Sequence, residues 1–223
     1  MNRRNLLKLG LSTAASLTAL NALASDSDET NGLFCKPRNR TAAQPKGPFY
    51  PVVDQIDKDA DLIYVNGSTT AALGEVVIVQ GLLTDQHCRA VPGALVEVWQ
   101  ACQSGRYDHP SDPNPAELDP HFQYWGQAVT DQNGFYRFRT IIPGAYPAGD
   151  GWIRPPHIHF KVSKLGYMEL ITQMYFAGEE LNNADLILRQ LREEKQKEVI
   201  VDFKNDPALA HPVGQFNIQI AKI

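Results

Sequence analysis

The chain has no run of basic residues, no long apolar stretch and few cysteines, and each of these limits what the protein can do. Its 223 residues carry 21 Lys and Arg against 25 Asp and Glu, a formal net charge of -4, which argues against nucleic acid as a partner. No apolar run approaches the roughly 20 residues of a membrane-spanning helix, so we expect no membrane contact in the mature form. With 43% hydrophobic and 21% charged residues, the composition is that of an ordinary globular protein.

The first 24 residues have the features of an export signal. Arg3-Arg4 precede a mildly apolar run from Leu9 to Leu20, and Ala22-Leu23-Ala24 forms a small-x-small cleavage site. The arginine pair favours the twin-arginine route, with an ordinary secretory signal as the alternative. We therefore expect residues 1–24 to be removed, which leaves a periplasmic or secreted chain with a net charge of about -7.

The three cysteines, Cys35, Cys88 and Cys102, lie in the exported part, where an oxidising compartment permits one disulfide and leaves one thiol. Cys88 and Cys102 flank an expected strand and would lie about 25 Å apart if that strand is straight, which makes them a poor pair. Cys35 can pair with either of the other two, and the sequence does not choose between them.

Short β-rich runs follow an extended polar lead-in over residues 25–47 and indicate one domain over residues 48–223. The runs cover Glu75–Leu83, Ala94–Ala101, Gln123–Thr130, Phe135–Thr140, His157–Ser163, Glu169–Phe176 and Gln215–Ile220. They are rich in β-branched and aromatic residues. Short strands at this spacing are typical of a sandwich or barrel, and we expect an all-β fold with a β-sandwich core of mixed or antiparallel strands and long active-site loops.

Two local patterns refine this outline. The Asn133-Gly134 pair in Asp131–Gly134 predicts a β-hairpin turn, because such turns need residues that adopt positive φ. One C-terminal helix is expected, beginning near Asn183 or Asp185 and continuing to about residue 198, because leucines form an imperfect apolar stripe there among charged residues.

The segment Trp152–Val162 contains two histidines at a spacing that favours metal binding. In a strand, His157 and His159 share one face, whereas the apolar residues that alternate with them share the other. Two imidazoles about 6.5–7 Å apart along a strand can converge on one metal ion. For an isolated His-x-His, an ordinary surface or core histidine pair is the alternative.

Six blocks between about Gln44 and Phe176 carry a family resemblance. They are Gly47–Pro51, Val96–Ala101 leading to Gly105–Tyr107, Thr130-Asp131 through Phe138–Thr140, Pro143–Pro147, Arg154–Phe160 and Thr172–Phe176. In this order they resemble the intradiol ring-cleaving catechol dioxygenases, most of all the β chain of the protocatechuate 3,4-dioxygenases. The resemblance implies an enzyme that takes a small catechol and O2, breaks the bond between the two hydroxylated carbons and gives a cis,cis-muconate-type diacid.

The resemblance also implies a cofactor and a set of site residues. Non-haem Fe(III) would be held by Tyr107, Tyr146, His157 and His159. Catalytic roles would fall to Tyr146, which acts as a base when the catechol binds, and to Arg154 and Gln173, which steady the charge of the bound substrate.

Chemical principles agree with this ligand set. Fe(III) is a hard ion and phenolate oxygen is a hard anionic ligand. Free tyrosine has a pKa near 10, so a phenol needs a strong neighbouring cation to ionise at neutral pH. Two tyrosinates and one hydroxide balance a 3+ charge, which limits the penalty of burying the centre.

The chain departs from the family pattern at several positions. Ala148 stands where the protocatechuate enzymes usually carry a bulky pocket aromatic, which puts protocatechuate itself in doubt. Gly47-Pro48-Phe49 and the four metal ligands lie on one chain, so a second chain type is not required, and a homo-oligomer is one option for the assembly. Lys46 and Arg106 could attract a ring carboxylate or could be solvated surface charges.

Two rival interpretations belong to other classes. A non-catalytic, transthyretin-like β-sandwich binding module would share the hairpin style of residues 130–136 but has no need of two tyrosines beside His-x-His. A copper or zinc site built on the histidines alone is the second rival.

Overall fold

The computed structural model describes residues 35–37, 39–55, 57–65 and 67–223. The predicted export signal, residues 1–24, lies outside these residues, and the predicted lead-in is described from Cys35 onward. Within the described part, no helix has both the length and the apolar character that crossing a bilayer requires.

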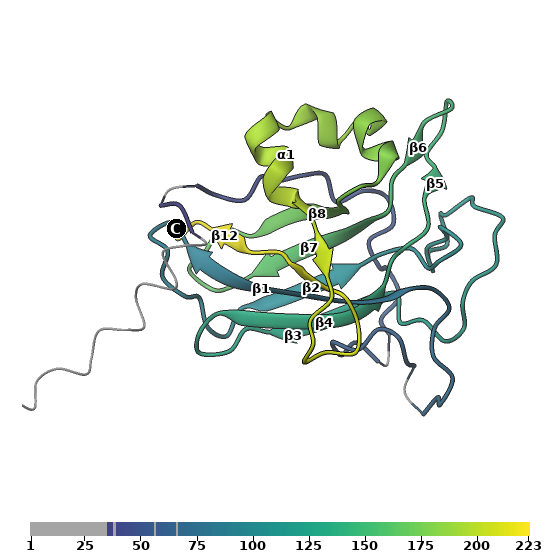
Figure 1. Ribbon diagram of the computed structural model, residues 1–223, viewed down its shortest axis with the longest axis horizontal. Helices are drawn as coiled ribbons and strands as arrows, with labels where there is room; N and C mark the ends of the chain where they lie inside the picture. The colour runs from purple at the N-terminus through teal and green to yellow at the C-terminus, as the bar shows by residue number, and fades with distance from the viewer. Residues whose placement is uncertain (1–34, 38, 56, 66) are drawn as a thin grey trace, which may run out of the picture.

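The strands form two main sheets and one short two-stranded pair (Figure 1). In chain order the strands are β1 (Val76–Asp85), β2 (Leu95–Trp99), β3 (Trp125–Val129), β4 (Phe135–Ile141), β5 (Tyr146–Pro147), β6 (Ile153–Arg154), β7 (His157–Ser163), β8 (Leu170–Phe176), β9 (Ile200–Val201), β10 (Phe203–Lys204), β11 (Val213–Gln215) and β12 (Ile218–Ile220). One sheet has the order β10-β11-β1-β12, with β4 also paired to β1, and the other has the order β3-β2-β7-β8-β9. Parallel and antiparallel pairs both occur, so the predicted all-β fold with mixed strands is confirmed.

The core lies between the two sheets and consists of the inward-facing residues of each strand. The sheets contribute Val77, Val79, Tyr136 and Phe138 on one side and Val96, Val98, Ile158, Phe160 and Val162 on the other. The ring of Phe160 lies 6.4 Å from that of Phe138 and 4.9 Å from that of Phe216. Each fully buried side chain of this size stabilises the fold by roughly 1.5–3 kcal/mol. Together these side chains hold the two sheets packed against each other.

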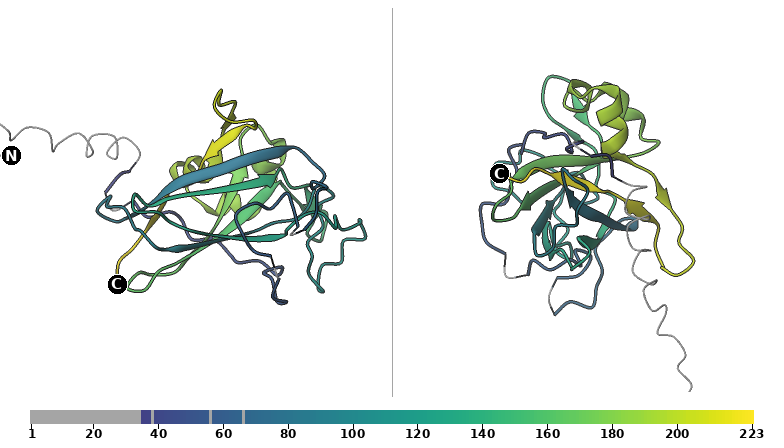
Figure 2. Two further views of the ribbon diagram at one scale, coloured as in Figure 1. Left: turned by 90° about the horizontal axis from the view of Figure 1, so that it is seen from below. Right: turned by 90° about the vertical axis from the view of Figure 1, so that its left-hand side faces the viewer.

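The long connections gather at one end of the sandwich. Figures 1 and 2 place the loop between β2 and β3 and the β5–β6 pair at the end of the molecule opposite the C-terminus. The helical segment after β8 lies along the outside of the sheet that contains β7 and β8. The loops therefore carry their side chains to the end where β7 begins.

The seven predicted runs all contain strands, but the predicted hairpin at Asp131–Gly134 is wrong. β3 pairs with β2 and β4 pairs with β1, so this turn joins the two sheets instead of two neighbouring strands. Gly134 has φ 75°, whereas Asn133 does not have positive φ. The Asp131 carboxylate accepts from the backbone N–H groups of Asn133 and Phe135, which makes a corner.

The predicted helix forms only in its last part. Residues Glu180–Ala184 and Leu188–Gln190 are short 3-10 helices, and α1 covers Glu193–Val199. Asp185 separates the first two, in an extended conformation, because its carboxylate is directed toward a buried arginine and toward the backbone that follows it. A buried charge pair thus overrides the helical propensity of the leucines.

The disulfide joins Cys35 to Cys88, and Cys102 is a buried free thiol. This settles the pairing that the sequence left open and agrees with the expectation that Cys88 and Cys102 are a poor pair. Cys88 lies in the turn between β1 and β2 with φ 62°, so the bond ties the start of the described chain to that turn.

The same turn is held by Asp85, and its stability should depend on pH. Burial raises the pKa of Asp85, but hydrogen bonds from the Arg89 side chain and from the backbone of Arg89 and His87 outweigh it and place the pKa below its usual range. A carboxyl with a depressed pKa stabilises the fold above its unfolded pKa, near 4, and this contribution is lost as the pH falls through the folded pKa.

We expect Asp85→Ala to lower the free energy of unfolding by about 2 kcal/mol at pH 7, because charged hydrogen bonds are lost. The difference from the parent chain should shrink as the pH is lowered from 5 toward 2. Urea unfolding across this pH range measures it, with Asp202→Ala, in an exposed ion pair with Lys204, as the control. Equal stability of the Asp85 variant and the parent at pH 7 would contradict the role of this carboxylate.

Candidate active site

β7 places the two histidines at the centre of the site. In its antiparallel pairing with β8, His157 lies opposite Tyr175 and His159 opposite Gln173. In its pairing with β2, His159 lies opposite Trp99. Both imidazoles are buried, at 2% and 3% exposure, and the intervening apolar side chains point into the sandwich core, as the alternation predicts.

The two tyrosines reach the histidines from separate loops that approach each other closely. Tyr107 follows β2 and Tyr146 lies in β5. A Cβ at Gly105 would collide with the carbonyl of Ala145, and Gly105 also has φ 80°, so only glycine fits there. This approach brings the two phenol rings to 5.5 Å, edge to face.

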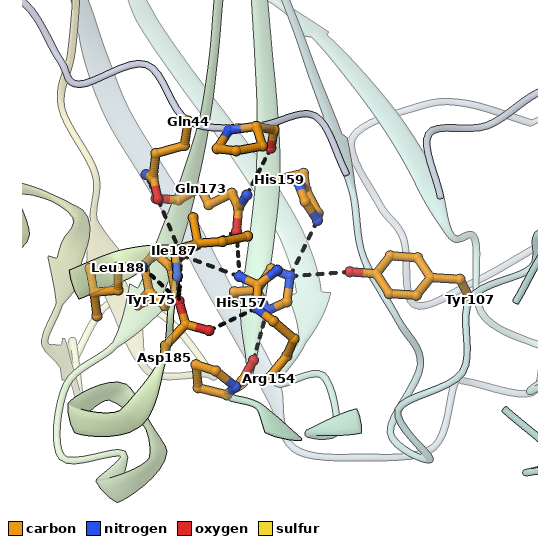
Figure 3. Close-up of polar contacts among 12 residues, drawn as sticks. Gln44, Tyr107, Arg154, His157, His159, Gln173, Tyr175, Asp185, Ile187 and Leu188 are labelled. Carbon is orange, nitrogen blue, oxygen red and sulfur yellow. Dashed lines mark hydrogen bonds and ion pairs between the residues drawn. The ribbon is translucent and has the colours of Figure 1, made fainter. Parts of the chain in front are cut away.

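Three of the four predicted ligands already lie in direct contact (Figure 3). Tyr107 Oη is 3.4 Å from His157 Nε2, and His157 Nε2 is 3.2 Å from His159 Nε2. The Tyr146 ring lies 5.7 Å from the His157 ring. The structure therefore brings together Tyr107, Tyr146, His157 and His159, of which the first and the last lie 52 positions apart in the sequence.

The histidines are arranged to present lone pairs. His157 Nδ1 lies 2.7 Å from the Pro155 carbonyl oxygen, which can only accept, so we assign the proton to Nδ1 and the lone pair to Nε2. Burial and the charge of Arg154 lower the pKa of both imidazoles well below the usual value, which keeps them neutral. Neutral imidazole is the form that binds a metal.

The phenols would remain protonated without a cation. Burial raises the pKa of Tyr107 well above 10, with a further increase from Tyr146. Burial also raises the pKa of Tyr146, although the neighbouring Arg154 acts in the opposite direction. A strong cation between these rings is the natural means of ionising them.

The donor set fits a ferric ion better than a zinc or copper ion. Among the described residues, no group of three or more His, Cys, Asp or Glu side chains could hold a metal, so the anionic ligands of a centre here would be the phenolates. His159 Nδ1 is buried without a hydrogen-bond partner in the described part of the chain, and its ring stacks on Trp99 at 4.7 Å. Two hard oxygens and two imidazoles in a buried site suit a hard trivalent ion.

Arg154 lies beside the ligands and is clamped by three side chains (Figure 3). Its Nε donates to Asp185 Oδ2 at 2.8 Å, and its Nη2 donates to Gln173 Oε1 at 2.6 Å and to the Tyr175 hydroxyl at 3.3 Å. Arg154 is 3% exposed and Asp185 is fully buried. Arg154 thus makes the structural ion pair and places its charge near the site, and Nη1 is the nitrogen that the clamp does not use.

Gln173 is oriented by both ends of its amide. Its Oε1 accepts from Arg154, and its Nε2 donates to the Pro45 carbonyl at 2.8 Å. Gln173 therefore connects the guanidinium to the N-terminal segment. The nearby turn at Gly47 also contacts the site, because a Cβ at this glycine would lie 3.3 Å from His159 Cε1.

Phe49, which the sequence analysis placed in the Gly47–Pro51 segment, completes the site together with Tyr175 and Asp185, which sequence reasoning did not single out as site residues. Phe49 packs on Tyr107 at 4.9 Å and on Tyr146 at 6.1 Å, so the Gly47–Pro51 segment covers the ligands within the same chain. Tyr175 could have been found, because it lies two residues after Gln173 on the same face of a strand. Asp185 carried no such signal, since only the fold brings it to Arg154.

Ala148, Arg106 and Lys46 are the residues that bear on substrate choice, and each has defined contacts in the structure. Ala148 is exposed in the turn between β5 and β6 and donates its N–H to the Trp152 carbonyl at 2.8 Å. The indole of Trp152 lies 5.4 Å from the Arg154 guanidinium carbon. Arg106 donates to the Ala116 carbonyl, and the Lys46 ammonium lies 4.9 Å over the Tyr50 ring.

Comparisons with known proteins find relatives in both sequence and fold. A family model described as "Dioxygenase" matches residues 46–219. The chain is 40% identical over 163 residues to a protocatechuate 3,4-dioxygenase beta chain of Burkholderia cepacia, covering 71% of this chain and 69% of that protein. It is 32% identical over 187 residues to a catechol 1,2-dioxygenase of Candida albicans, covering 76% of this chain but 55% of that longer protein.

A solved structure has the same fold. The dioxygenase domain of a dioxygenase carbohydrate-binding protein fusion from the cellulolytic bacterium Streptomyces sp. SirexAA-E superposes with a TM-score of 0.61 at 26% identity. The match covers 83% of this chain and 100% of that domain. The likeness thus extends over most of the described fold.

The Arg154–Asp185 pair generates a stability prediction. We expect Asp185→Ala to lower the free energy of unfolding by about 3–5 kcal/mol, because it leaves a buried guanidinium without its counter-charge. Urea unfolding at pH 7 measures the change. Glu193→Ala, which removes an exposed ion pair with Lys197, is the matched control and should unfold like the parent. A small effect at Asp185 would show that the pair is not needed for the fold.

Proposed function

The chain belongs to the intradiol ring-cleavage dioxygenase family, and from this premise we propose that it uses non-haem Fe(III) to cleave a catechol between its two hydroxylated carbons. Each of these carbons becomes a carboxyl carbon, so one O2 is consumed per ring and the product is a cis,cis-muconate-type diacid. The observation that carries the proposal is the convergence of two phenols and two neutral imidazoles at the end of the sandwich where β7 begins.

Tyr107, Tyr146, His157 and His159 would hold the ion. When bound, Fe(III) supplies the Lewis acidity that ionises the hydroxyls of the catechol and lets the ring react with O2. The protein keeps this chemistry in a dry site, because Phe49 covers the phenols and Trp99 stacks on His159.

Tyr146 accepts a proton in this proposal, and Arg154 stabilises negative charge. Tyr146 and Arg154 are paired residues on β5 and β6, and Tyr146 takes a hydroxyl proton from the substrate at its Oη. Arg154, fixed by Asp185 and Gln173, holds a permanent positive charge where the ring becomes anionic. A donor that is already oriented needs no reorganisation during the reaction.

For the substrate, we propose a catechol without a ring carboxylate. Arg106 donates one N–H to the Ala116 carbonyl, and the Lys46 ammonium lies over the face of Tyr50, so both of these cations already have a partner within the chain. Catechol or an alkylcatechol therefore suits the site better than protocatechuate.

Oxygen uptake with product absorbance tests the reaction. We expect the purified protein to show visible tyrosinate-to-iron absorption, to consume one O2 per catechol and to act faster on catechol than on protocatechuate. Tyr107→Phe and His159→Ala should abolish both the absorption and the uptake, because each removes a ligand. Tyr64→Phe, a half-buried tyrosine under Arg139 away from the ligands, is the control and should retain both.

Other outcomes would contradict specific parts of this proposal. A fully active Tyr107→Phe enzyme would refute the ligand set, and a yellow semialdehyde product would indicate cleavage beside the hydroxylated carbons instead of between them. A colourless protein without oxygen uptake would favour the binding-module interpretation.

We also propose that the chain is exported and acts in the periplasm or outside the cell. The Arg3-Arg4 pair and the cleavage site at Ala22-Leu23-Ala24 support this, and the Cys35–Cys88 disulfide suits an oxidising compartment. We expect Arg3→Lys/Arg4→Lys in the full chain to retain the protein in the cytoplasm, with Lys8→Gln as the control. Fractionation and immunoblotting measure this, and unchanged export of the double variant would exclude the twin-arginine route.

A further inference from the structure

Gln44 lies on the N-terminal segment, far in sequence from the ligands, yet it contacts the residues around Arg154. Its side chain is 7% exposed, and its backbone N–H donates to the Ile171 carbonyl at 2.9 Å. The segment therefore lies along β8, next to Gln173 and Tyr175 (Figure 3). The function proposed above does not assign any role to this residue.

The orientation of the Gln44 amide is determined by its neighbours. The Thr172 hydroxyl donates its proton to the Ala42 carbonyl at 2.8 Å, so its oxygen must accept from Gln44 Nε2, at 3.1 Å. The second Nε2–H donates to the Gln173 backbone carbonyl at 2.9 Å, and a carbonyl can only accept. Gln44 Oε1 is therefore the atom that faces Tyr175.

This orientation determines where the Tyr175 hydroxyl sends its single proton. Three acceptors lie within reach: Gln44 Oε1 at 3.1 Å, Gln173 Oε1 at 3.2 Å and Asp185 Oδ1 at 3.4 Å. Gln173 Oε1 already accepts from Arg154, and Asp185 Oδ1 already accepts from the backbone of Ile187 and Leu188. Gln44 Oε1 is the nearest of the three and accepts from no other donor among the described residues, so we assign the proton to the bond with Gln44.

We propose that Gln44 is a positioning residue for the ring-cleavage reaction, which directs the Tyr175 proton away from the Arg154 clamp. With its proton on Gln44, the Tyr175 oxygen accepts from Arg154 Nη2, and Gln173 Oε1 stays free for the same guanidinium. Without Gln44, the hydroxyl turns to Gln173 or Asp185 and competes with Arg154 for them. This inference rests on the proposed function, because it assigns Gln44 to the charge that Arg154 offers the substrate.

Gln44→Met keeps the length of the side chain and removes both hydrogen-bonding ends. We expect kcat to fall by about tenfold, as is usual when an outer partner of a catalytic group is lost. Iron content and visible absorption should stay at the parent values, because no ligand contacts Gln44. Asn39→Ala is the matched control on the same segment, since its amide bonds Glu198 and Lys195 on α1, and it should leave kcat unchanged.

A double-mutant cycle with Tyr175→Phe separates positioning from packing. Tyr175→Phe removes the hydroxyl that Gln44 accepts from and leaves every residue of the N-terminal segment unchanged, so it also tests the Gln44–Tyr175 contact if Gln44→Met does not fold. If Gln44 acts through that hydroxyl, Gln44→Met should change kcat about tenfold in the parent and hardly at all in the Tyr175→Phe background. Equal, additive effects in both backgrounds, or loss of iron in Gln44→Met, would overturn the proposal.

Binding of 4-nitrocatechol keeps this test separate from that of the proposed function. Titration without O2 measures its dissociation constant in the same four proteins, whether or not the parent cleaves a ring. Weaker binding in Gln44→Met that disappears in the Tyr175→Phe background supports the positioning role. Unchanged binding in Gln44→Met together with unchanged kcat refutes it, whereas a parent that binds but does not cleave refutes only the proposed function.

Discussion

The register of β7 between β2 and β8 is the constraint on which the site depends. Because side chains alternate along a strand, a shift of one residue would put His157 and His159 into the apolar core and expose Phe160 to the site. The core residues of β7 prevent this shift, since they pack against the opposite sheet through the aromatic contacts of Phe160. The same packing that stabilises the fold therefore fixes the direction of both imidazoles.

Two kinds of buried polar group meet at this end of the sandwich, and they are satisfied in different ways. The Arg154 clamp is complete within the protein, because Asp185 balances the guanidinium charge and Gln173 and Tyr175 take further N–H groups. The ligand cluster instead brings neutral phenols and imidazoles into contact with one another, since His157 Nε2 lies 3.4 Å from Tyr107 Oη and 3.2 Å from His159 Nε2. The hydrogen-bonded clamp holds its shape, and it therefore fixes the position of the guanidinium beside the ligand cluster.

The sequence predicted much of this arrangement and missed specific parts. Period-two alternation located the strands and the shared face of His157 and His159, because alternation is a local property. The Asp131–Gly134 turn was misjudged as a hairpin, since turn residues do not reveal which sheet the next strand joins. The helix near Asp185 was overextended because the partner of that carboxylate, Arg154, lies 31 residues away in the chain.

By itself, the sequence predicted the all-β class and the shared face of His157 and His159, because alternation is a local property. The candidate ligands Tyr107 and Tyr146 came from the family resemblance of the blocks around them. Only the tertiary structure decided that Cys35 pairs with Cys88, that Asp185 closes the Arg154 clamp, and that Gln44 reaches Tyr175 from the N-terminal segment. These contacts join residues up to 131 positions apart. They follow from how two sheets and their loops pack together, and no local pattern carries that information.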